Sequence, residues 1–206
     1  MEDVRELKNV LERVEGRLIA AGKLYGAINF ALWLSVMTVF YVLNGIGKMS
    51  GWTSPLYWEI AVLIAVPLTV KIWNRLKKLY LTFCSHMDEM GSKRAVVLMG
   101  LAWAIGSIIG WVLIPSTSGI GVNAGARLGV GFLSFIGFSL LGQWLVMTHG
   151  RGEYEMVPSF AFPFLAIPVA WHMESGAIVW AGFVVAAGFS LTILWYLYSA
   201  FRAIER

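Results

Sequence analysis

Charged side chains are scarce in this sequence of 206 residues: they make up 14% of it, whereas 58% of the residues are apolar. Soluble domains of this size carry about a quarter charged residues and under half apolar ones. Folding does not hide such an excess, because a small globule keeps much of its surface in water. The composition therefore excludes a soluble enzyme, a nucleic-acid-binding module and a disordered chain, and it indicates an integral membrane protein.

Side chains that carry chemistry are equally few. The single cysteine, Cys84, excludes an internal disulfide. The two aspartates, Asp3 and Asp88, fall outside the apolar stretches, which excludes a catalytic aspartate pair within the membrane. No glycine-rich phosphate-binding loop is present in the sequence either. We therefore expect a protein that is not an enzyme and that has no cofactor, no resident metal site and no nucleic-acid partner.

Long apolar runs are what the sequence has in abundance. A bilayer core about 30 Å thick needs about 20 apolar residues in a helix, and strands of outer-membrane type would alternate in polarity, which these runs do not. We expect an all-α, polytopic membrane protein with six transmembrane helices, at 24–43, 56–74, 95–114, 128–147, 157–173 and 177–201. The fifth run is the shortest and contains three prolines, so the alternative there is a re-entrant segment.

Basic residues are distributed unequally between the two sides of this arrangement. Of the 16 lysines and arginines, all but Lys48 and Arg127 fall on the side of both termini. Cytoplasmic loops carry the excess of basic residues, so we expect both termini in the cytoplasm of a multi-pass protein of the cell membrane. Residues 24–201 then form the transmembrane domain, and 202–206 form a cytoplasmic tail.

Residues 1–23 are expected to form a cytoplasmic amphipathic helix. An apolar stripe recurs at intervals of three and four residues: Val4, Leu7, Leu11, Val14 and Leu18. The five basic residues of this segment are balanced by five acidic ones, whereas a helix that lies on anionic lipid is rich in lysine and arginine. The stripe therefore favours contact with a partner protein or another copy over a plain interfacial helix.

Small residues predict where the spans pack. Pairs of glycines four residues apart lie in the third span and at the start of the fourth: Gly106 with Gly110, and Gly125 with Gly129. Helices in lipid associate through such small-residue faces, because the backbones can approach closely. The neighbouring helix can belong to the same chain or to a second subunit, so a homo-oligomer and a hetero-complex both remain open.

Two further sets of residues are candidates for a role inside the membrane. Pro163 and Pro168 free backbone carbonyls in the fifth span, one of them near Ser159, and broken helices of this kind line substrate paths in transporters. A kinked helix packed on its neighbours is the simpler interpretation. Glu59 and Arg127 lie near the outer ends of two spans and are a candidate ion pair between them.

Three functions remain compatible with these features. The first is a transport component, such as the permease subunit of an ATP-driven transporter that works with a separate ATPase; its ground plan has an N-terminal helix, six spans and a cytoplasmic loop after the second span. That comparison rests on topology alone. The alternative is a non-catalytic scaffold or accessory subunit that assembles through its helices with a membrane or cytosolic protein. The third is a membrane enzyme that acts on lipid.

Overall fold

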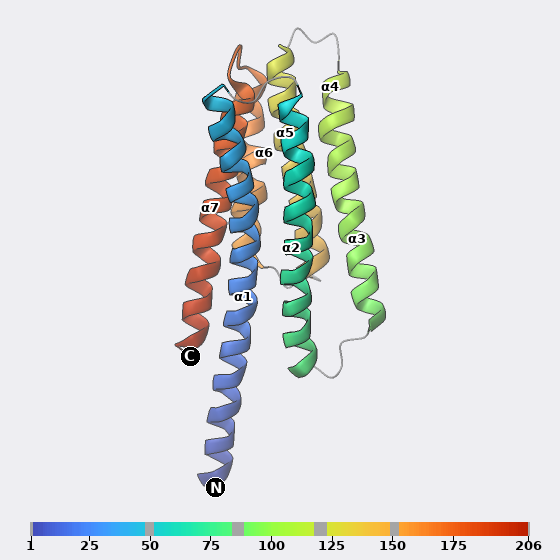
Figure 1. Cartoon of the computed structure of the whole chain (residues 1–206). Coiled ribbons are helices and arrows are strands. Elements are labelled where there is room, and N and C mark those ends of the chain that lie inside the picture. Colours follow the sequence, from blue (N-terminus) through green and yellow to red (C-terminus); the bar gives the residue numbers. More distant parts are fainter. Residues whose placement is uncertain (1, 48–51, 84–88, 118–122, 149–152, 206) are drawn as a thin grey trace. The chain divides into compact units, whose positions relative to one another are not determined.

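The computed structural model describes residues 2–47, 52–83, 89–117, 123–148 and 153–205. Every element in these ranges is a helix, with short turns between them and no strand (Figure 1), so the predicted all-α class is confirmed. The elements are α1 (Glu2–Gly45), α2 (Thr53–Phe83), α3 (Glu89–Ile108), η1 (Ile109–Leu113), α4 (Ile114–Ser116), α5 (Ala124–Thr148), η2 (Tyr154–Met156), α6 (Val157–Trp171) and α7 (Ala177–Ile204).

Five of these helices contain segments long and apolar enough to cross a membrane: Glu6–Asn44, Thr53–Arg75, Val96–Ser116, Ala124–Met147 and Ala177–Ile204. The remaining prediction, the fifth span over 157–173, corresponds to α6, which has 15 residues. An α-helix of that length covers about 22 Å, short of a bilayer core, and the 3-10 turn η2 before it adds about 6 Å. These helices are therefore compatible with a membrane-embedded protein, while a count of six spans stays a prediction.

The π-helical turn η1 interrupts the third span just before Pro115. Proline lacks the backbone N–H that would bond the carbonyl four residues earlier. The backbone N–H of Ile114 instead donates to the carbonyl of Ile109, five residues back. Single π turns of this kind are the usual way for a helix to absorb such a local mismatch.

The chain divides into two compact units: unit 1 comprises Met1–His86 with Ile193–Arg206, and unit 2 comprises Met87–Thr192. Helix α7 contributes its C-terminal part to unit 1 and its N-terminal part to unit 2.

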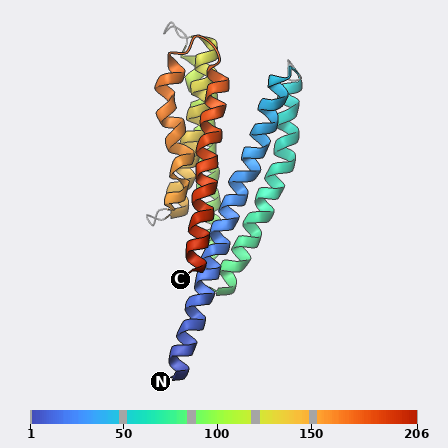
Figure 2. The same cartoon turned by 90° about the vertical axis from the view of Figure 1, so that its left-hand side faces the viewer.

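In unit 1, α1 and α2 form an antiparallel hairpin that both ribbon views show side by side (Figures 1 and 2). Aromatic rings join the two helices where they approach the connecting turn. The ring of Phe40 lies 5.5 Å from that of Tyr57 and 5.1 Å from that of Trp58. The Tyr57 hydroxyl donates to the carbonyl of Val36 at 2.5 Å. This contact fixes the register of the hairpin and satisfies a polar group that would otherwise face lipid.

The end of α7 packs on the middle of α1. The ring of Tyr196 stacks on Phe30 at 6.1 Å, and the ammonium of Lys23 lies 5.6 Å from the centre of the same tyrosine ring. One turn earlier in α1, a Cβ added to Gly26 would stand 3.0 Å from the Tyr196 ring. The missing side chain of this glycine therefore makes room for the tyrosine.

In unit 2, α5 lies in the centre, and many of its side chains are buried. The buried residues include Ala126, Val130, Leu133, Ser134, Ile136, Ser139 and Leu140. Helix α3 packs on one face of α5 and α6 on another. The buried face of α5 is rich in alanine, glycine and serine, which allows its neighbours to approach the backbone closely.

Candidate functional site

The N-terminal extension, residues 2–23, is continuous with the first span. We expected an amphipathic helix over 1–23 and a span over 24–43, and in the structure both stretches belong to one unbroken helix, α1, of 44 residues. At 1.5 Å per residue α1 is about 66 Å long, roughly twice the thickness of a bilayer core. The extension is therefore an unbroken helical continuation of a segment long and apolar enough to span a membrane.

The apolar stripe of the extension is largely uncovered toward its N-terminal end. Leu7, Val10 and Leu11 are 61%, 50% and 60% exposed, while Val14 and Leu18 are half-buried. The side chain of Val4 lies outside the part of the chain that the structure describes. The stripe thus has a half-buried part, at Val14 and Leu18, and an open half nearer the N-terminus.

The boundary between these halves lies between Leu11 and Val14, just before Gly16, where the end of α7 reaches α1. A Cβ added to Gly16 would stand 2.5 Å from the carbonyl oxygen of Ala203. Both ribbon views show α1 continuing past the C-terminal end of α7 (Figures 1 and 2). Residues before Gly16 therefore extend beyond the last turn of their neighbour within unit 1.

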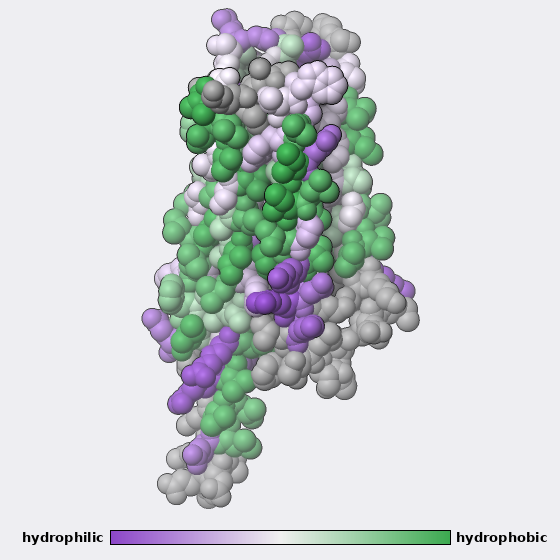
Figure 3. Space-filling model, in the orientation of Figure 1, coloured by the Kyte–Doolittle hydropathy of each residue, from purple (hydrophilic) through white to green (hydrophobic). Residues whose placement is uncertain are grey.

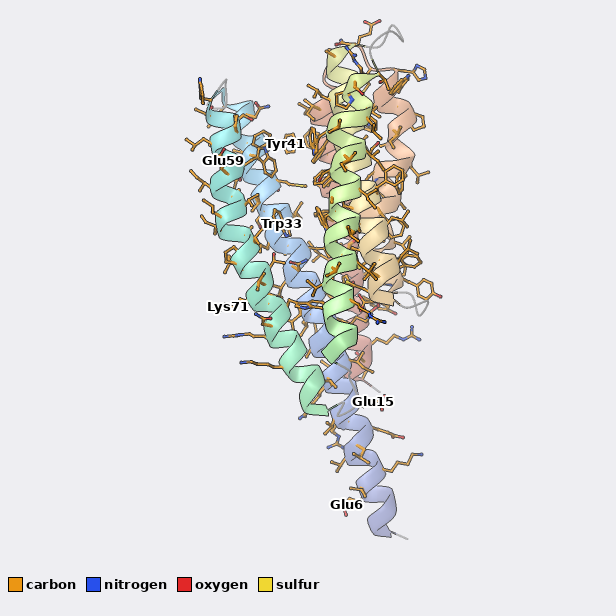
Figure 4. The ribbon with its side chains drawn as sticks, turned by 90° about the vertical axis from the view of Figure 1, so that its right-hand side faces the viewer. Glu6, Glu15, Trp33, Tyr41, Glu59 and Lys71 are labelled. Atoms are coloured by element: carbon orange, nitrogen blue, oxygen red, sulfur yellow. The ribbon has the colours of Figure 1, made fainter. Side chains whose placement is uncertain are left out.

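The extension also exposes charged side chains beside its apolar stripe. Lys8 and Glu12 form an ion pair of 3.6 Å one turn apart, and both side chains are largely exposed. Such pairs stabilise an isolated helix by about 0.3–0.5 kcal/mol. Figure 4 shows Glu6 and Glu15 on the same projecting part of α1. The extension therefore combines an exposed apolar stripe with a surface of mixed charge, a pattern typical of a helix that binds another helix.

The candidate residues of α6 occupy packing positions. Ser159 is completely buried, and its hydroxyl donates to the carbonyl of Met156 at 2.6 Å. Pro163 is buried as well, whereas Pro168 is exposed on another face of the helix. A substrate path beside this helix stays a prediction.

Three of the four glycines expected at packing faces lie against neighbouring helices of unit 2. A Cβ on Gly110 would stand 2.6 Å from the Cβ of Phe135 in α5, and one on Gly106 would stand 3.0 Å from the carbonyl oxygen of the same residue. A Cβ on Gly129 would stand 2.8 Å from the carbonyl oxygen of Ala177. These neighbours belong to the same chain.

Gly125 differs from the other three glycines. A Cβ there would meet only the side-chain oxygen of Asn123, at 3.7 Å. The backbone N–H of Gly125 donates to that oxygen at 3.0 Å, so Asn123 caps the start of α5. The side-chain amide of Asn123 also donates to the carbonyl of Glu174 in the turn before α7. Gly125 therefore lies in a helix cap, not at a helix crossing.

Glu59 and Arg127 lie in different units. Glu59 is exposed on α2, where Figure 4 shows it, and Arg127 is half-buried near the start of α5. The guanidinium Nε of Arg127 is buried without a hydrogen-bond partner among the described atoms. The ion pair between these two residues stays a prediction.

Several polar contacts in unit 2 were missed from the sequence. The indole N–H of Trp103 donates to the side-chain oxygen of Gln143 at 3.0 Å, which joins α3 to α5. The indole N–H of Trp144 donates to the carbonyl of Glu153 at 3.0 Å. Gln143 is the only glutamine in the chain and lies within an apolar run, which was a visible signal of a buried polar contact.

Two short segments with potential ligand side chains lie outside the described residues. They are 84–88, with Cys84, His86 and Asp88, and 149–152, with His149 and Arg151. Within the ranges that are described, no group of three or more histidine, cysteine or acidic side chains could hold a metal ion.

These features define the class: an all-helical protein with several helices long and apolar enough to span a membrane, one of which extends far beyond its apolar part. Comparisons with protein-family models, with curated proteins and with solved structures gave no match to this chain.

Proposed function

We propose that this protein is a non-enzymatic membrane subunit that binds a cytoplasmic partner protein through the N-terminal extension. The observation that carries the proposal is the open half of the apolar stripe, in which Leu7 and Leu11 are 61% and 60% exposed on a helix that is rigidly continuous with a span. The excess of basic residues on the side of both termini supports a cytoplasmic position for the extension.

Burial of the open stripe supplies a clear driving force for binding. Covering one exposed leucine side chain completely contributes about 1.5–3 kcal/mol. Leu7, Val10 and Leu11 lie within little more than one turn, so a single partner helix covers all three at once. The balanced charges beside the stripe favour a protein partner over an anionic membrane surface, which attracts helices rich in lysine and arginine.

The extension is also positioned to transmit a movement of the bound partner to α7. Gly16 contacts the end of α7 through Ala203, and Lys23 lies over Tyr196 in the same helix. A partner bound at Leu7 and Leu11 is therefore held by α1 within three turns of the contact between Gly16 and α7. The scaffold and transport hypotheses share this docking step and differ in what the bound partner drives.

A transport role is the second candidate, in which the partner is a separate ATPase and this chain is the permease subunit. The observation that favours it is α6, which has 15 residues and contains Pro163 and Pro168. Short, proline-interrupted helices are a recurring feature of substrate sites in transporters. The continuity of α1 speaks against a close analogy with exporters, in which the N-terminal helix is a separate element.

Purification from native membranes in mild detergent, with the Leu7→Ala, Leu11→Ala double variant beside the wild type, tests the proposal. The Glu6→Ala, Arg13→Ala variant is the matched control, because both residues are exposed on the face opposite the stripe and their joint replacement leaves the net charge and the Lys8–Glu12 ion pair unaltered. We expect a soluble protein in a fixed stoichiometric ratio with the wild type and the control, and its loss from the leucine variant. Equal recovery with all three proteins would refute docking through the stripe.

The identity of the recovered partner separates the two candidate functions. An ATPase whose hydrolysis rate changes when this chain is bound supports the permease subunit. A partner without nucleotide hydrolysis supports the scaffold or accessory subunit. A wild-type protein that elutes only with copies of itself would overturn the hetero-complex.

A further inference from the structure

We infer that one face of α2 is a binding site for an anionic phospholipid, independently of the function proposed above. An open hollow with a volume of about 410 Å³ runs along this helix. It is lined by Pro67, Val70, Lys71, Asn74, Arg75 and Lys78. These positions recur every three to four residues, so they share one face of the helix over about 16 Å.

The part of the hollow toward the C-terminal end of α2 is cationic, and two of its basic residues, Lys71 and Arg75, have no acidic partner among the residues that the structure describes. Lys71 and Arg75 are one turn apart, a spacing at which two like charges repel each other. Residues 60–87 contain no aspartate or glutamate. Neither Lys71 nor Arg75 forms an ion pair with any residue that the structure describes. A phosphodiester placed between them would remove this repulsion and accept hydrogen bonds from both side chains and from Asn74.

The nearest acidic residue of α2 is too distant to serve that purpose. Glu59 precedes Lys71 by 12 residues, which corresponds to about 18 Å along the helix axis. Figure 4 shows the two side chains well separated along α2, both directed away from α1.

The part of the hollow toward the N-terminal end of α2 is apolar and continues into an exposed apolar face of the helix. Pro67 and Val70 form its wall, and Val70 is 49% exposed. Further along the same face Val66 and Leu63 are 42% and 73% exposed. In Figure 3 a hydrophilic patch lies over the lower half of α2, directly below a hydrophobic surface. An acyl chain fits along the apolar face while its headgroup occupies the cationic end.

This arrangement identifies a lipid, not a soluble anion, as the occupant. Inorganic phosphate would use Lys71 and Arg75 and leave the exposed valine and leucine side chains without a partner. A zwitterionic lipid would also use the apolar face. The positive group of its headgroup, however, would repel Lys71 and Arg75. Only a phospholipid with a net negative headgroup matches both halves, and clusters of lysine and arginine at the cytoplasmic end of a spanning helix bind such lipids.

Native mass spectrometry of the purified full-length protein, supplied with phosphatidylglycerol or phosphatidylcholine of identical acyl chains, tests the assignment. The test variant is Lys71→Gln, Arg75→Gln. The matched control is Arg94→Gln, Arg202→Gln, which removes the same charge from two exposed cations outside the hollow. We expect the wild type and the control to retain phosphatidylglycerol over phosphatidylcholine, and the test variant to bind phosphatidylglycerol about thirtyfold more weakly.

Two outcomes would overturn the assignment. Equal loss of phosphatidylglycerol from the test and control variants would mean that only overall charge matters. Displacement of the lipid by millimolar inorganic phosphate would mean that the apolar half of the hollow contributes nothing. All of these substitutions are at exposed positions, so we expect every variant to fold. A circular dichroism spectrum unchanged from that of the wild type checks this.

Discussion

Gly110 lies where the backbone of the third span comes very close to α5. A Cβ at this position would stand 2.6 Å from the Cβ and 2.9 Å from the backbone nitrogen of Phe135. Because one of these atoms belongs to the backbone, the helices have to separate to admit even a methyl group. We expect Gly110→Ala to lower the free energy of unfolding in detergent by about 1–3 kcal/mol, measured by equilibrium denaturation.

Gly100 of the same helix is the control for this substitution. No atom lies within 4 Å of a Cβ built there. Gly100→Ala should leave the stability unchanged or raise it by up to about 1 kcal/mol, because alanine is the better helix former. A loss of stability as large as that of Gly110→Ala would show that the close approach to Phe135 is not the cause.

The bond between Trp103 and Gln143 gives a second prediction for single residues. The two side chains join α3 and α5 at 3.0 Å within an apolar environment. In a double-mutant cycle of Trp103→Phe and Gln143→Leu, we expect a coupling energy of about 0.6–1.7 kcal/mol, the range found for hydrogen bonds between spanning helices. Additivity of the two substitutions within about 0.3 kcal/mol would contradict the contact.

At the level of the residue, the sequence predicted which kinds of residue lie at helix contacts better than it predicted which two residues contact each other. The glycine spacing indicated close helix contacts, and Gly110 and Gly129 do lie against neighbours. The partner of Gln143 could not be predicted, because Trp103 is 40 residues away and nothing local specifies how the two helices are rotated toward each other. Gly125 has the same spacing as the others but lies in a cap, because a pattern of small residues does not state which of them meets a neighbour.

Helix α6 is the element whose packing separates the candidate functions. Ala166 of α6 is 6% exposed and lies one turn after Pro163, whereas the adjacent Leu165 is 76% exposed. In a Cys84→Ser background we expect neither Ala166→Cys nor Leu165→Cys to react with a water-soluble maleimide, because the first thiol is packed in protein and the second faces lipid.

A third cysteine shows that the maleimide experiment works. Glu205→Cys, at an exposed position after α7, should react fully. Reaction at Ala166→Cys, together with no reaction at Leu165→Cys, would contradict the packing of Ala166 against protein without water. That result would favour a water-filled substrate path beside α6, and with it the transport hypothesis.

At the level of the element, the length of the apolar runs predicted that the elements are helices and roughly where they lie. It did not predict the residues at which each helix begins and ends. Residues 1–23 and the first span form one helix because no proline separates them, and the glycines between them are tolerated by packing: Gly16 meets Ala203 and Gly26 meets Tyr196. The fifth apolar run yields only 15 residues of α-helix, with a 3-10 turn before it. Hydropathy does not reveal such details, because it records what dissolves in lipid and not how the backbone is bonded.

For the whole molecule, the proposal makes α1 the connection between the membrane and a partner. About half of this 44-residue helix suffices to cross a bilayer core, and the rest carries the open stripe. Composition alone predicted the membrane class, because an apolar excess of this size has no other physical solution. The partner could not be predicted, since an apolar stripe specifies that something covers it and not what does.

Photo-crosslinking in native membranes measures this connection most directly. A photo-reactive amino acid replaces Leu11, on the open stripe, or Arg13, on the opposite face of the same exposed turns. We predict one discrete crosslinked protein from position 11 and none from position 13. Equal crosslinking from both positions, or crosslinking to lipid alone from position 11, would show that the N-terminal extension does not dock a partner through its stripe.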